Sequence, residues 1–243
     1  NTKIVAISHI SNTLGTINPI KKIISLCHAV GAKVLIDGAQ AASHIALDVQ
    51  EIDADFYCFS AHKMYGPTGL GVLYGKEALL NKMPPYQGGG EMISDVSFEK
   101  TKYAELPYKF EAGTPNIGAI VAFKAAIEFI CKVGIDNICL HEQSLLKYAT
   151  SEILKIKKVK IYGNSSSKSA IISFNIDGLH PYDIGVLLDK MGIAIRTGHH
   201  CTQPIMDKFK IPGTARVSLA MYNTKEEIDI FIQSLKKVIK MLM

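Results

Sequence analysis

The feature of the sequence that most constrains its fold is the alternation of short apolar runs with helix-length segments. Apolar runs stand at 3–8, 33–38, 55–60 and 71–75, and a helical pattern that begins at a proline fills 19–30. Strands separated by segments of this length predict a parallel or mixed sheet with helices on its faces. The first half of the chain is therefore expected to be an α/β domain whose ligands gather at the carboxyl ends of its strands.

The second half of the chain follows a different pattern. A long apolar helix is predicted over 117–134 and an amphipathic one over 136–158. Shorter elements follow, with strands expected at 160–163, 170–176, 193–198 and 215–220 and helices at 182–191 and from residue 225. This series predicts a compact α+β domain, and we expect domains at 1–130 and 131–243. Between the two patterns, 83–114 is rich in proline and glycine and is predicted to be a long functional loop.

Composition excludes several classes of protein. No apolar run approaches the roughly 20 residues of a membrane-spanning helix, so no contact with a membrane is expected. The net charge is +5, but all except two of the 27 basic residues are lysines spread along the chain. Nucleic-acid binders cluster such charge on one face, so no nucleic-acid partner is expected. The five cysteines are odd in number and contain no CxxC pair, which favours a reducing, cytoplasm-like compartment over a disulfide framework.

Only one of the cysteines has polar neighbours. Cys27, Cys58, Cys131 and Cys139 stand among apolar residues and are interpreted as small core side chains. Cys201 lies in RTGHHC, beside two histidines and close to one of the two arginines. A metal site is disfavoured because adjacent residues on a turn rarely point at one ion, whereas zinc ligands are usually spaced. A reactive thiol fits better, since cationic neighbours stabilise a thiolate.

Polar residues also follow the predicted strands of the first half. Asn12 follows the first strand, Asp37 ends the second, and Ser60, His62 and Lys63 follow the third. Each alone is most simply a turn former, a cap or a solvated surface residue. Together, a carboxylate and a lysine at the ends of neighbouring strands suit a pyridoxal phosphate site. The lysine would form the Schiff base and the carboxylate would keep the ring nitrogen protonated.

Four motifs, in order along the chain, carry a family resemblance: VLIDGAQA (34–41), FSAHKMYGPTGLGVLY (59–74), FEAGTPN (110–116) and RTGHHC (196–201). They resemble the signatures of the group II cysteine desulfurases and selenocysteine lyases, which are fold-type I, aminotransferase-like enzymes. The resemblance covers essentially the whole chain. It implies a mixed, mostly parallel sheet belonging to part of the large cofactor-binding domain, followed by a small α+β domain. The family also has more than a hundred earlier residues, including the one that stacks on the cofactor ring.

The resemblance also implies roles for the residues. Lys63 would carry the cofactor and relay protons, Asp37 would pair with the ring nitrogen, and Gln40 would bond the ring hydroxyl. The phosphate would be bound by Ser60, by His62 and, from the other subunit of a homodimer, by Thr114. The substrate would be held by Asn12, near the ring hydroxyl, and by the carboxylate-binding Arg216. Arg196 is either a further substrate residue or a structural brace.

The expected activity follows from these roles. Cys201 would take sulfur from L-cysteine as a persulfide, leaving L-alanine, and a protein acceptor would receive the sulfur for iron-sulfur cluster assembly in the cytoplasm. A selenocysteine lyase acting on L-selenocysteine is the first alternative. A non-catalytic fragment or scaffold is the second. An aminotransferase is disfavoured because transamination does not explain Cys201.

Overall fold

The computed structural model describes all residues from 1 to 243, and these form two compact units. The first unit contains 1–8, 19–43 and 47–132, and the second contains 9–18, 44–46 and 133–243. The main division thus falls between Lys132 and Val133. A single boundary near residue 130 would assign the short segments 9–18 and 44–46 to the first unit, but both pack with the second unit.

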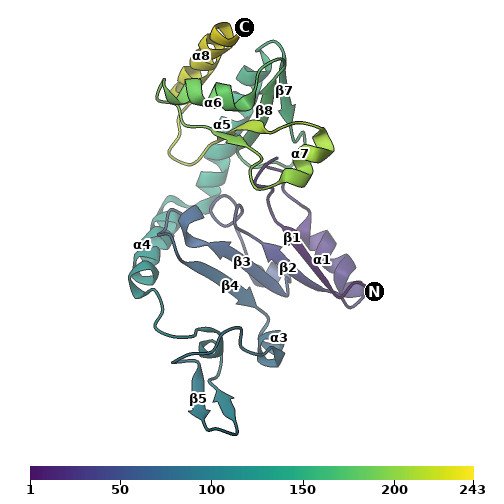
Figure 1. Ribbon diagram of the computed structural model, residues 1–243, viewed down its shortest axis with the longest axis vertical. Helices are drawn as coiled ribbons and strands as arrows, with labels where there is room; N and C mark the ends of the chain where they lie inside the picture. The colour runs from purple at the N-terminus through teal and green to yellow at the C-terminus, as the bar shows by residue number, and fades with distance from the viewer. The chain divides into compact units, whose positions relative to one another are not determined.

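The first unit is built on a four-stranded sheet (Figure 1). Its strands are β1 (Ile4–Ser8), β2 (Lys33–Asp37), β3 (Phe56–Ser60) and β4 (Gly71–Gly75), in that spatial order. The first three run parallel and β4 is antiparallel to β3, so the predicted mixed, mostly parallel sheet is confirmed. Helix α1 (Ile20–Ala29) also matches its prediction, whereas the short α2 (Val49–Ile52) was not anticipated.

The side chains of the strands alternate between two faces of the sheet, and only one of these faces packs against α1. Val34 and Ile36 of β2 and Tyr57 of β3 are fully buried and pack with Ile20 and Ile24 of α1. Successive side chains of a strand point to opposite faces. The residues between these core positions, which include Leu35, therefore lie on the face away from α1. The polar ends of β2 and β3 belong to that second face.

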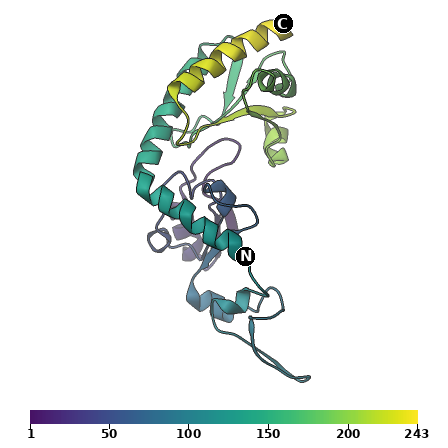
Figure 2. The ribbon, with the colours of Figure 1, turned by 90° about the vertical axis from the view of Figure 1, so that its left-hand side faces the viewer.

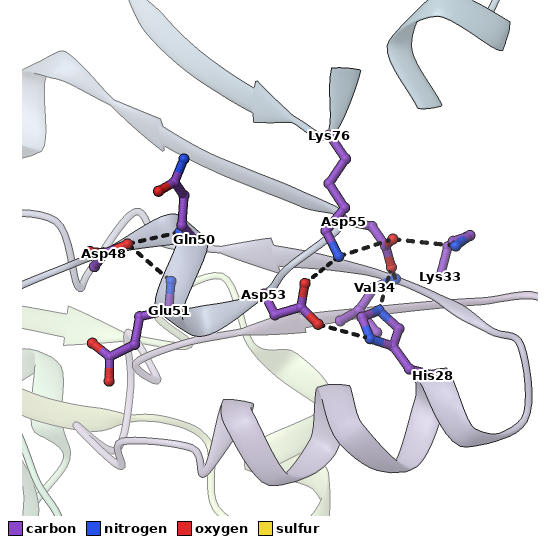
Figure 3. A network of polar contacts seen from close by, with 9 residues as sticks. All are labelled: His28, Lys33, Val34, Asp48, Gln50, Glu51, Asp53, Asp55 and Lys76. Atoms are coloured by element: carbon purple, nitrogen blue, oxygen red, sulfur yellow. Dashed lines mark hydrogen bonds and ion pairs between the residues drawn. The ribbon is translucent and has the colours of Figure 1, made fainter. Parts of the chain in front are cut away.

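A polar network at the start of the same strands ties the unit together (Figure 3). Asp55, whose side chain is 1% exposed, accepts hydrogen bonds from His28 Nε2 and from Val34 N, each at 2.8 Å. Lys33 Nζ lies 3.4 Å from the same carboxylate, and Lys76 pairs with neighbouring Asp53. Burial by itself would raise the pKa of Asp55. The hydrogen bonds from His28 and Val34 and the charge of Lys33 together outweigh burial, so the pKa of Asp55 lies below its ordinary value.

The segment 83–114 is not the featureless loop that its composition predicted. After α3 (Glu77–Lys82), it forms a hairpin of β5 (Ile93–Val96) and β6 (Thr101–Tyr103), followed by a 3₁₀ turn, η2 (Tyr108–Phe110). Figures 1 and 2 show this hairpin projecting from the rest of its unit. The prediction failed because the strands are short and carry exposed side chains on both faces, so no apolar alternation marks them.

Helix α4 (Ile117–Val133) closes the first unit and leads into the second. Its buried side chains Phe123 and Ala126 pack on Ala61, at the end of β3. None of the helices, α4 included, is long and apolar enough to cross a membrane.

The second unit is an antiparallel sheet covered by helices. Its elements are α5 (Ile135–Leu154), β7 (Val159–Tyr162), β8 (Ile171–Ile176), α6 (Pro181–Asp189), β9 (Arg196–Gly198), α7 (Gln203–Phe209), β10 (Thr214–Ser218) and α8 (Lys225–Leu242). The strands lie in the order β7-β8-β10-β9. The predicted α+β architecture is confirmed, and only the short α7 was missed.

Helices α5 and α8 supply most of the second core. Figure 2 shows α8 running beside the strands of this unit. Leu145 of α5 and Leu235 of α8 are fully buried with Ile172 and Phe174 of β8. A capping box begins α8: Thr224 accepts from Glu227 N, and Glu227 accepts from Thr224 N. The helices thus pack against the sheet that contains Arg196 and Arg216.

Candidate active site

The first group of predicted site residues lies at the carboxyl ends of β2 and β3. Asp37 is the register partner of Cys58, and Ser60 follows Cys58 on the same face of β3, opposite Gly71 of β4. These residues line a pocket of about 330 Å³ on the sheet face away from α1. The expectation that polar strand ends meet in the first half of the chain is therefore met for Asp37 and Ser60.

The backbone after Asp37 is held in place by a close approach to Tyr57. Gly38 N donates to Cys58 O at 2.7 Å, and a Cβ added at Gly38 would lie 2.0 Å from the Tyr57 ring. Only glycine fits here. Asp37 Oδ1 accepts from Ala39 N at 2.9 Å, which orients the carboxylate and leaves Oδ2 available. Burial and the charge of Asp37 raise the pKa of Cys58, so this thiol is neutral.

Lys63 and His62 lie just beyond this pocket along the chain. They belong to a 3₁₀ turn, η1 (Ala61–Lys63), that follows β3, and both are exposed. The turn is fixed by backbone bonds from Ala61 N to Leu70 O and from Gly66 N to Ala61 O, each at 3.0 Å. Lys63 Nζ has neither a carboxylate nor a hydrogen-bond partner, so its amine is available to a ligand.

Two further predicted residues lie outside the pocket lining. Gln40 is half-buried in the turn after Asp37, and Thr114 is exposed in the segment before α4. Thr114 precedes Asn116, whose Oδ1 accepts from Ala119 N in the first turn of that helix. The role of Thr114 toward another subunit stays a prediction.

The second group of residues belongs to the second unit and begins with two arginines. Arg196 of β9 is the register partner of Arg216 of β10, and no carboxylate of the chain forms an ion pair with either. Arg216 donates from Nη1 to Asn12 O at 2.9 Å and to Asn12 Oδ1 at 3.0 Å, while its buried Nε has no partner. Burial lowers the pKa of Arg216, and the charge of Arg196 acts in the same direction. A bound anion would offset both effects, because it stabilises the charged form of the guanidinium.

Cys201 lies on a tight turn beside this pair. Thr202 N donates to His199 O at 2.9 Å, and the two residues between them, His200 and Cys201, have φ of 54° and 62°. Left-handed backbone at two successive residues is typical of turns that favour glycine or asparagine. The turn leaves Cys201 exposed, and Arg196 Nη2 approaches its Sγ to 3.6 Å.

His200 is buried beneath the turn rather than exposed beside the thiol. Its Nε2 lies 2.8 Å from Thr214 Oγ1 and 3.1 Å from Thr214 O, and its backbone carbonyl accepts from Asn12 Nδ2 at 2.9 Å. Burial, followed by the charge of Arg216, lowers the pKa of His200 to about 4. The ring is therefore neutral near pH 7. Of the side chains close to Cys201, Arg196 rather than His200 supplies the positive charge.

Sequence reasoning missed several residues that build these two groups. Thr214 anchors His200, and Thr13 joins Thr202 through their hydroxyls at 2.6 Å. Nothing in the local patterns marks these threonines, since their partners lie far away along the chain. The interpretation of Cys131 as a core residue was wrong, because it is exposed on α4. Cys58 was predicted to be a core residue, but its half-buried thiol lines the Asp37 pocket.

The residues around the first pocket fit pyridoxal phosphate. They offer an unpaired primary amine for a Schiff base and a carboxylate with a free oxygen for the ring nitrogen. A serine hydroxyl and an imidazole close by can donate hydrogen bonds to a phosphate. Gly71, opposite Ser60, adds no side chain to the floor of the pocket, so a flat ring can approach the backbone.

Comparison with known proteins identifies the family. Residues 1–231 match the family model described as Aminotransferase class-V. A curated cysteine desulfurase of Shigella sonnei is 50% identical over 242 residues, and one of Escherichia coli K12 is 49% identical. Each alignment covers 99% of this chain and 59% of the relative, so the chain spans just under three fifths of their length.

Solved structures agree. The crystal structure of the Escherichia coli cysteine desulfurase CsdA superposes with a TM-score of 0.95 at 37% identity, covering 99% of this chain and 60% of that one. The apo cysteine desulfurase of Thermococcus onnurineus also gives 0.95, at 38% identity, covering 98% and 60%. The fold expected from the motifs is therefore confirmed. Because the family model matches residues 1–231, this chain is a member of the aminotransferase class-V family.

Proposed function

We propose that this chain carries the catalytic residues of a pyridoxal phosphate-dependent cysteine desulfurase. The observation that carries the proposal is Cys201, an exposed thiol on a strained turn with Arg196 beside it. Strained backbone persists at functional sites when the surrounding contacts hold it. The names of the relatives support the same activity.

The first unit would hold the cofactor, as part of the large domain, and the second would act as the small domain. Lys63 would bind it covalently through the free Nζ, and Asp37 would pair with the ring nitrogen through the oxygen that Ala39 leaves open. Ser60 and His62 would donate to the phosphate, with Thr114 of a second subunit. Gln40 would bond the ring hydroxyl. When bound, the cofactor would act as an electron sink that weakens bonds around the substrate Cα and Cβ.

The second unit would bind the substrate and take its sulfur. Arg216 would hold the carboxylate, using the Nε that now lacks a partner, and Asn12 beside it would orient the same group. The Cys201 thiolate would attack the substrate sulfur, so that the new S–S bond forms as the C–S bond breaks. The electron pair of that bond would pass toward Cβ, which takes a proton relayed by Lys63. L-cysteine and the thiol thus become L-alanine and a persulfide.

The finer parts of the proposal concern partners. We propose that the persulfide passes to an acceptor protein for iron-sulfur cluster assembly in the cytoplasm and that the protein acts as a homodimer. The hairpin supports the dimer because its large apolar side chains are open to solvent: Ile93, Val96 and Phe98 are at least 38% exposed. Apolar groups gathered on one projecting element favour burial against a protein surface.

The test uses the full-length protein that contains this chain. Borohydride reduction of the cofactor-loaded protein is expected to attach the cofactor to Lys63, as peptide mass spectrometry would show, and Lys63→Ala is expected to abolish the label. L-cysteine is expected to yield L-alanine in the native protein but not in Cys201→Ser. A protein that takes up no cofactor and forms no alanine would instead be a scaffold.

A further inference from the structure

A pocket of about 440 Å³ lies beside β7, an edge strand of the second unit. Side chains alternate along a strand, and Val159 and Ile161 of β7 pack in the core. Lys160 and Tyr162 therefore lie on the opposite face, where they line the pocket together with Lys158. None of the residues in the proposed active site belongs to this lining, so the proposed function gives the pocket no role.

The lining carries more positive than negative charge. Lys158 and Lys160 are both exposed, and neither forms an ion pair with a carboxylate of the chain. Lys160 Nζ lies 5.3 Å from the centroid of the Tyr162 ring, and this cation–π contact keeps the ammonium group near another lining residue. Asp177, which is also exposed, is the only carboxylate in the lining. Two ammonium groups against one carboxylate favour an anionic ligand.

Hydrogen-bond donors that no group of the chain uses are also present in the lining. His180 Nδ1 accepts from Tyr182 N at 3.3 Å, so the proton of the neutral ring is on Nε2, which is free to donate. Tyr162 is only 5% exposed, yet its hydroxyl forms no hydrogen bond within the chain. Polar groups of side chains as buried as this one are normally hydrogen-bonded. The Tyr162 hydroxyl therefore needs a partner from outside the chain.

Acceptors without a donor lie on the neighbouring strand, β8. Asn175 is the register partner of Lys160, and its Nδ2 donates to Gly213 O at 2.9 Å. This bond orients the amide, and Oδ1 is left as a buried acceptor without a partner. Asp177 follows at the end of the strand, and its exposed carboxylate has no partner either. A ligand that binds here should therefore carry a donor, such as a hydroxyl group, as well as a negative charge.

The donors match a phosphate better than a carboxylate. A phosphate monoester presents three strong acceptor oxygens and a charge of about −1.5 to −2 near pH 7. The two lysines, the His180 ring and the Tyr162 hydroxyl can supply a donor to each of these oxygens. Carboxylates are matched best by the planar fork of arginine, and no arginine lines this pocket. Ile211 and Pro212 complete the wall and suit the carbon skeleton of a small ester.

We propose that this pocket binds a small phosphate monoester that also carries a hydroxyl group. The phosphate accepts from both lysines, from His180 Nε2 and from the Tyr162 hydroxyl, and the ligand hydroxyl donates to Asp177. The site shares no residue with the proposed active site, so the inference does not rest on the proposed function.

Lysine acetylation reports the occupancy of the pocket residue by residue. Cofactor-loaded full-length protein would be acetylated with and without glycerol 3-phosphate, which has a phosphate and two hydroxyl groups. At saturation, the acetylation rates of Lys158 and Lys160 are expected to fall about tenfold, the factor that a hydrogen bond to a charged group is worth. Lys157, which is exposed but outside the lining, is the internal control, and glycerol is the control without phosphate. Equal protection of Lys157, or no protection of Lys158 and Lys160, would overturn the site.

Variants test the individual contacts by calorimetric titration with glycerol 3-phosphate. Lys160→Gln is expected to raise the Kd about tenfold, whereas the matched Lys157→Gln should leave it unchanged. Tyr162→Phe is expected to raise it about fivefold, because it removes the unpartnered hydroxyl and keeps the ring that packs on Phe209. Its urea unfolding midpoint should match that of the native protein for the same reason. A Kd that is unchanged in both Lys160→Gln and Tyr162→Phe would contradict the proposal.

The contact with the ligand hydroxyl has its own test. Native protein is expected to bind glycerol 3-phosphate about fivefold more tightly than inorganic phosphate, and Asp177→Ala is expected to bind the two alike. An equal Kd for the two ligands in native protein would overturn this contact. Alanine formation from L-cysteine, measured in the same preparations, tests the proposed function separately, since either result can hold while the other fails.

Discussion

Arg196 and Arg216 lie directly opposite each other in the β9–β10 register, and neither has a carboxylate partner in the chain. Like charges in opposite positions destabilise a sheet. The sheet tolerates the pair for two reasons. Arg196 is exposed to solvent, and Arg216 donates hydrogen bonds from Nη1 to the two oxygens of Asn12, which stabilise its positive charge. The arrangement leaves two neighbouring guanidinium groups without a carboxylate to pair with.

Replacing Arg216 by lysine should therefore weaken substrate binding while the fold survives. A charged hydrogen bond is lost and the bidentate geometry with it, so kcat/KM for L-cysteine is expected to fall about 10- to 100-fold. Steady-state alanine formation measures this. The cofactor absorbance band should persist as a control, because Arg216 lies outside the residues that would hold the cofactor. An unchanged KM would show that the carboxylate binds elsewhere.

Gly38 should be among the least replaceable residues beside the pocket that Asp37 lines. Its Cβ would overlap the Tyr57 ring, and overpacking of this kind costs about 1–3 kcal/mol. Gly38→Ala is therefore expected to lower the free energy of unfolding and to reduce cofactor content. Gly118→Ala is the matched control, since its Cβ meets nothing within 4 Å and alanine favours a helix. Equal behaviour of the two variants would argue against a close approach at Gly38.

Asp55 should matter far more for stability than its neighbour Asp53. The side chain of Asp55 is 1% exposed, whereas that of Asp53 is 60% exposed. Asp55→Asn is expected to cost about 3 kcal/mol, because it leaves His28 and Lys33 without their buried partner. Asp53→Asn should cost no more than about 1 kcal/mol. Urea unfolding followed by circular dichroism compares them.

The pH dependence of the same pair of proteins gives a second check. The pKa of Asp55 is held below its ordinary value in the fold, so its contribution is present above about pH 4 and is lost as the pH falls through the folded pKa. The difference between native protein and Asp55→Asn should therefore shrink in acid. A difference that grows on acidification would contradict the arrangement in Figure 3.

On acidification, the two buried histidines of the second unit should lower the stability at a higher pH than Asp55 does in the first unit. Burial lowers the pKa of His9 and of His200 from 6.5 to about 4. The unfolded chain takes up these protons near pH 6.5 and the folded chain does not, so stability falls as the pH drops from about 6.5 to about 4. Each histidine contributes a slope of up to about 1.4 kcal/mol per pH unit. His9→Gln should reduce the slope in urea unfolding, whereas Asp55→Asn should leave it unchanged.

The fold was largely predictable because its strands are compact apolar runs with polar ends. KVLID and FYCFS place Asp37 and Ser60 at strand ends by periodicity alone, and the structure puts both in one pocket. The hairpin at 93–103 escaped prediction because its exposed strands carry no pattern. The segment 9–18 escaped because its bonds, such as Ser173 Oγ to Thr13 O, join residues 160 positions apart.

The sequence allowed prediction of the reactive and charged groups of the site, but not of the buried residues that hold them in position. Cys201, Arg196 and Arg216 are conspicuous because arginine is scarce and the cysteine is flanked by polar residues. The burial and neutral state of His200 were not foreseeable, since they depend on the packing of β10 under the turn. Tertiary burial, which no local pattern records, decides the charge state of such a residue.

The most direct test of the account is to locate the sulfur after one turnover. Full-length protein would be mixed with L-cysteine, and its thiol-blocked peptides analysed by mass spectrometry. The account predicts one added sulfur atom on the peptide that contains Cys201, no added sulfur at Cys58, and none at all in Lys63→Ala. Unlabelled Cys201 together with undiminished alanine formation in Cys201→Ser would contradict it.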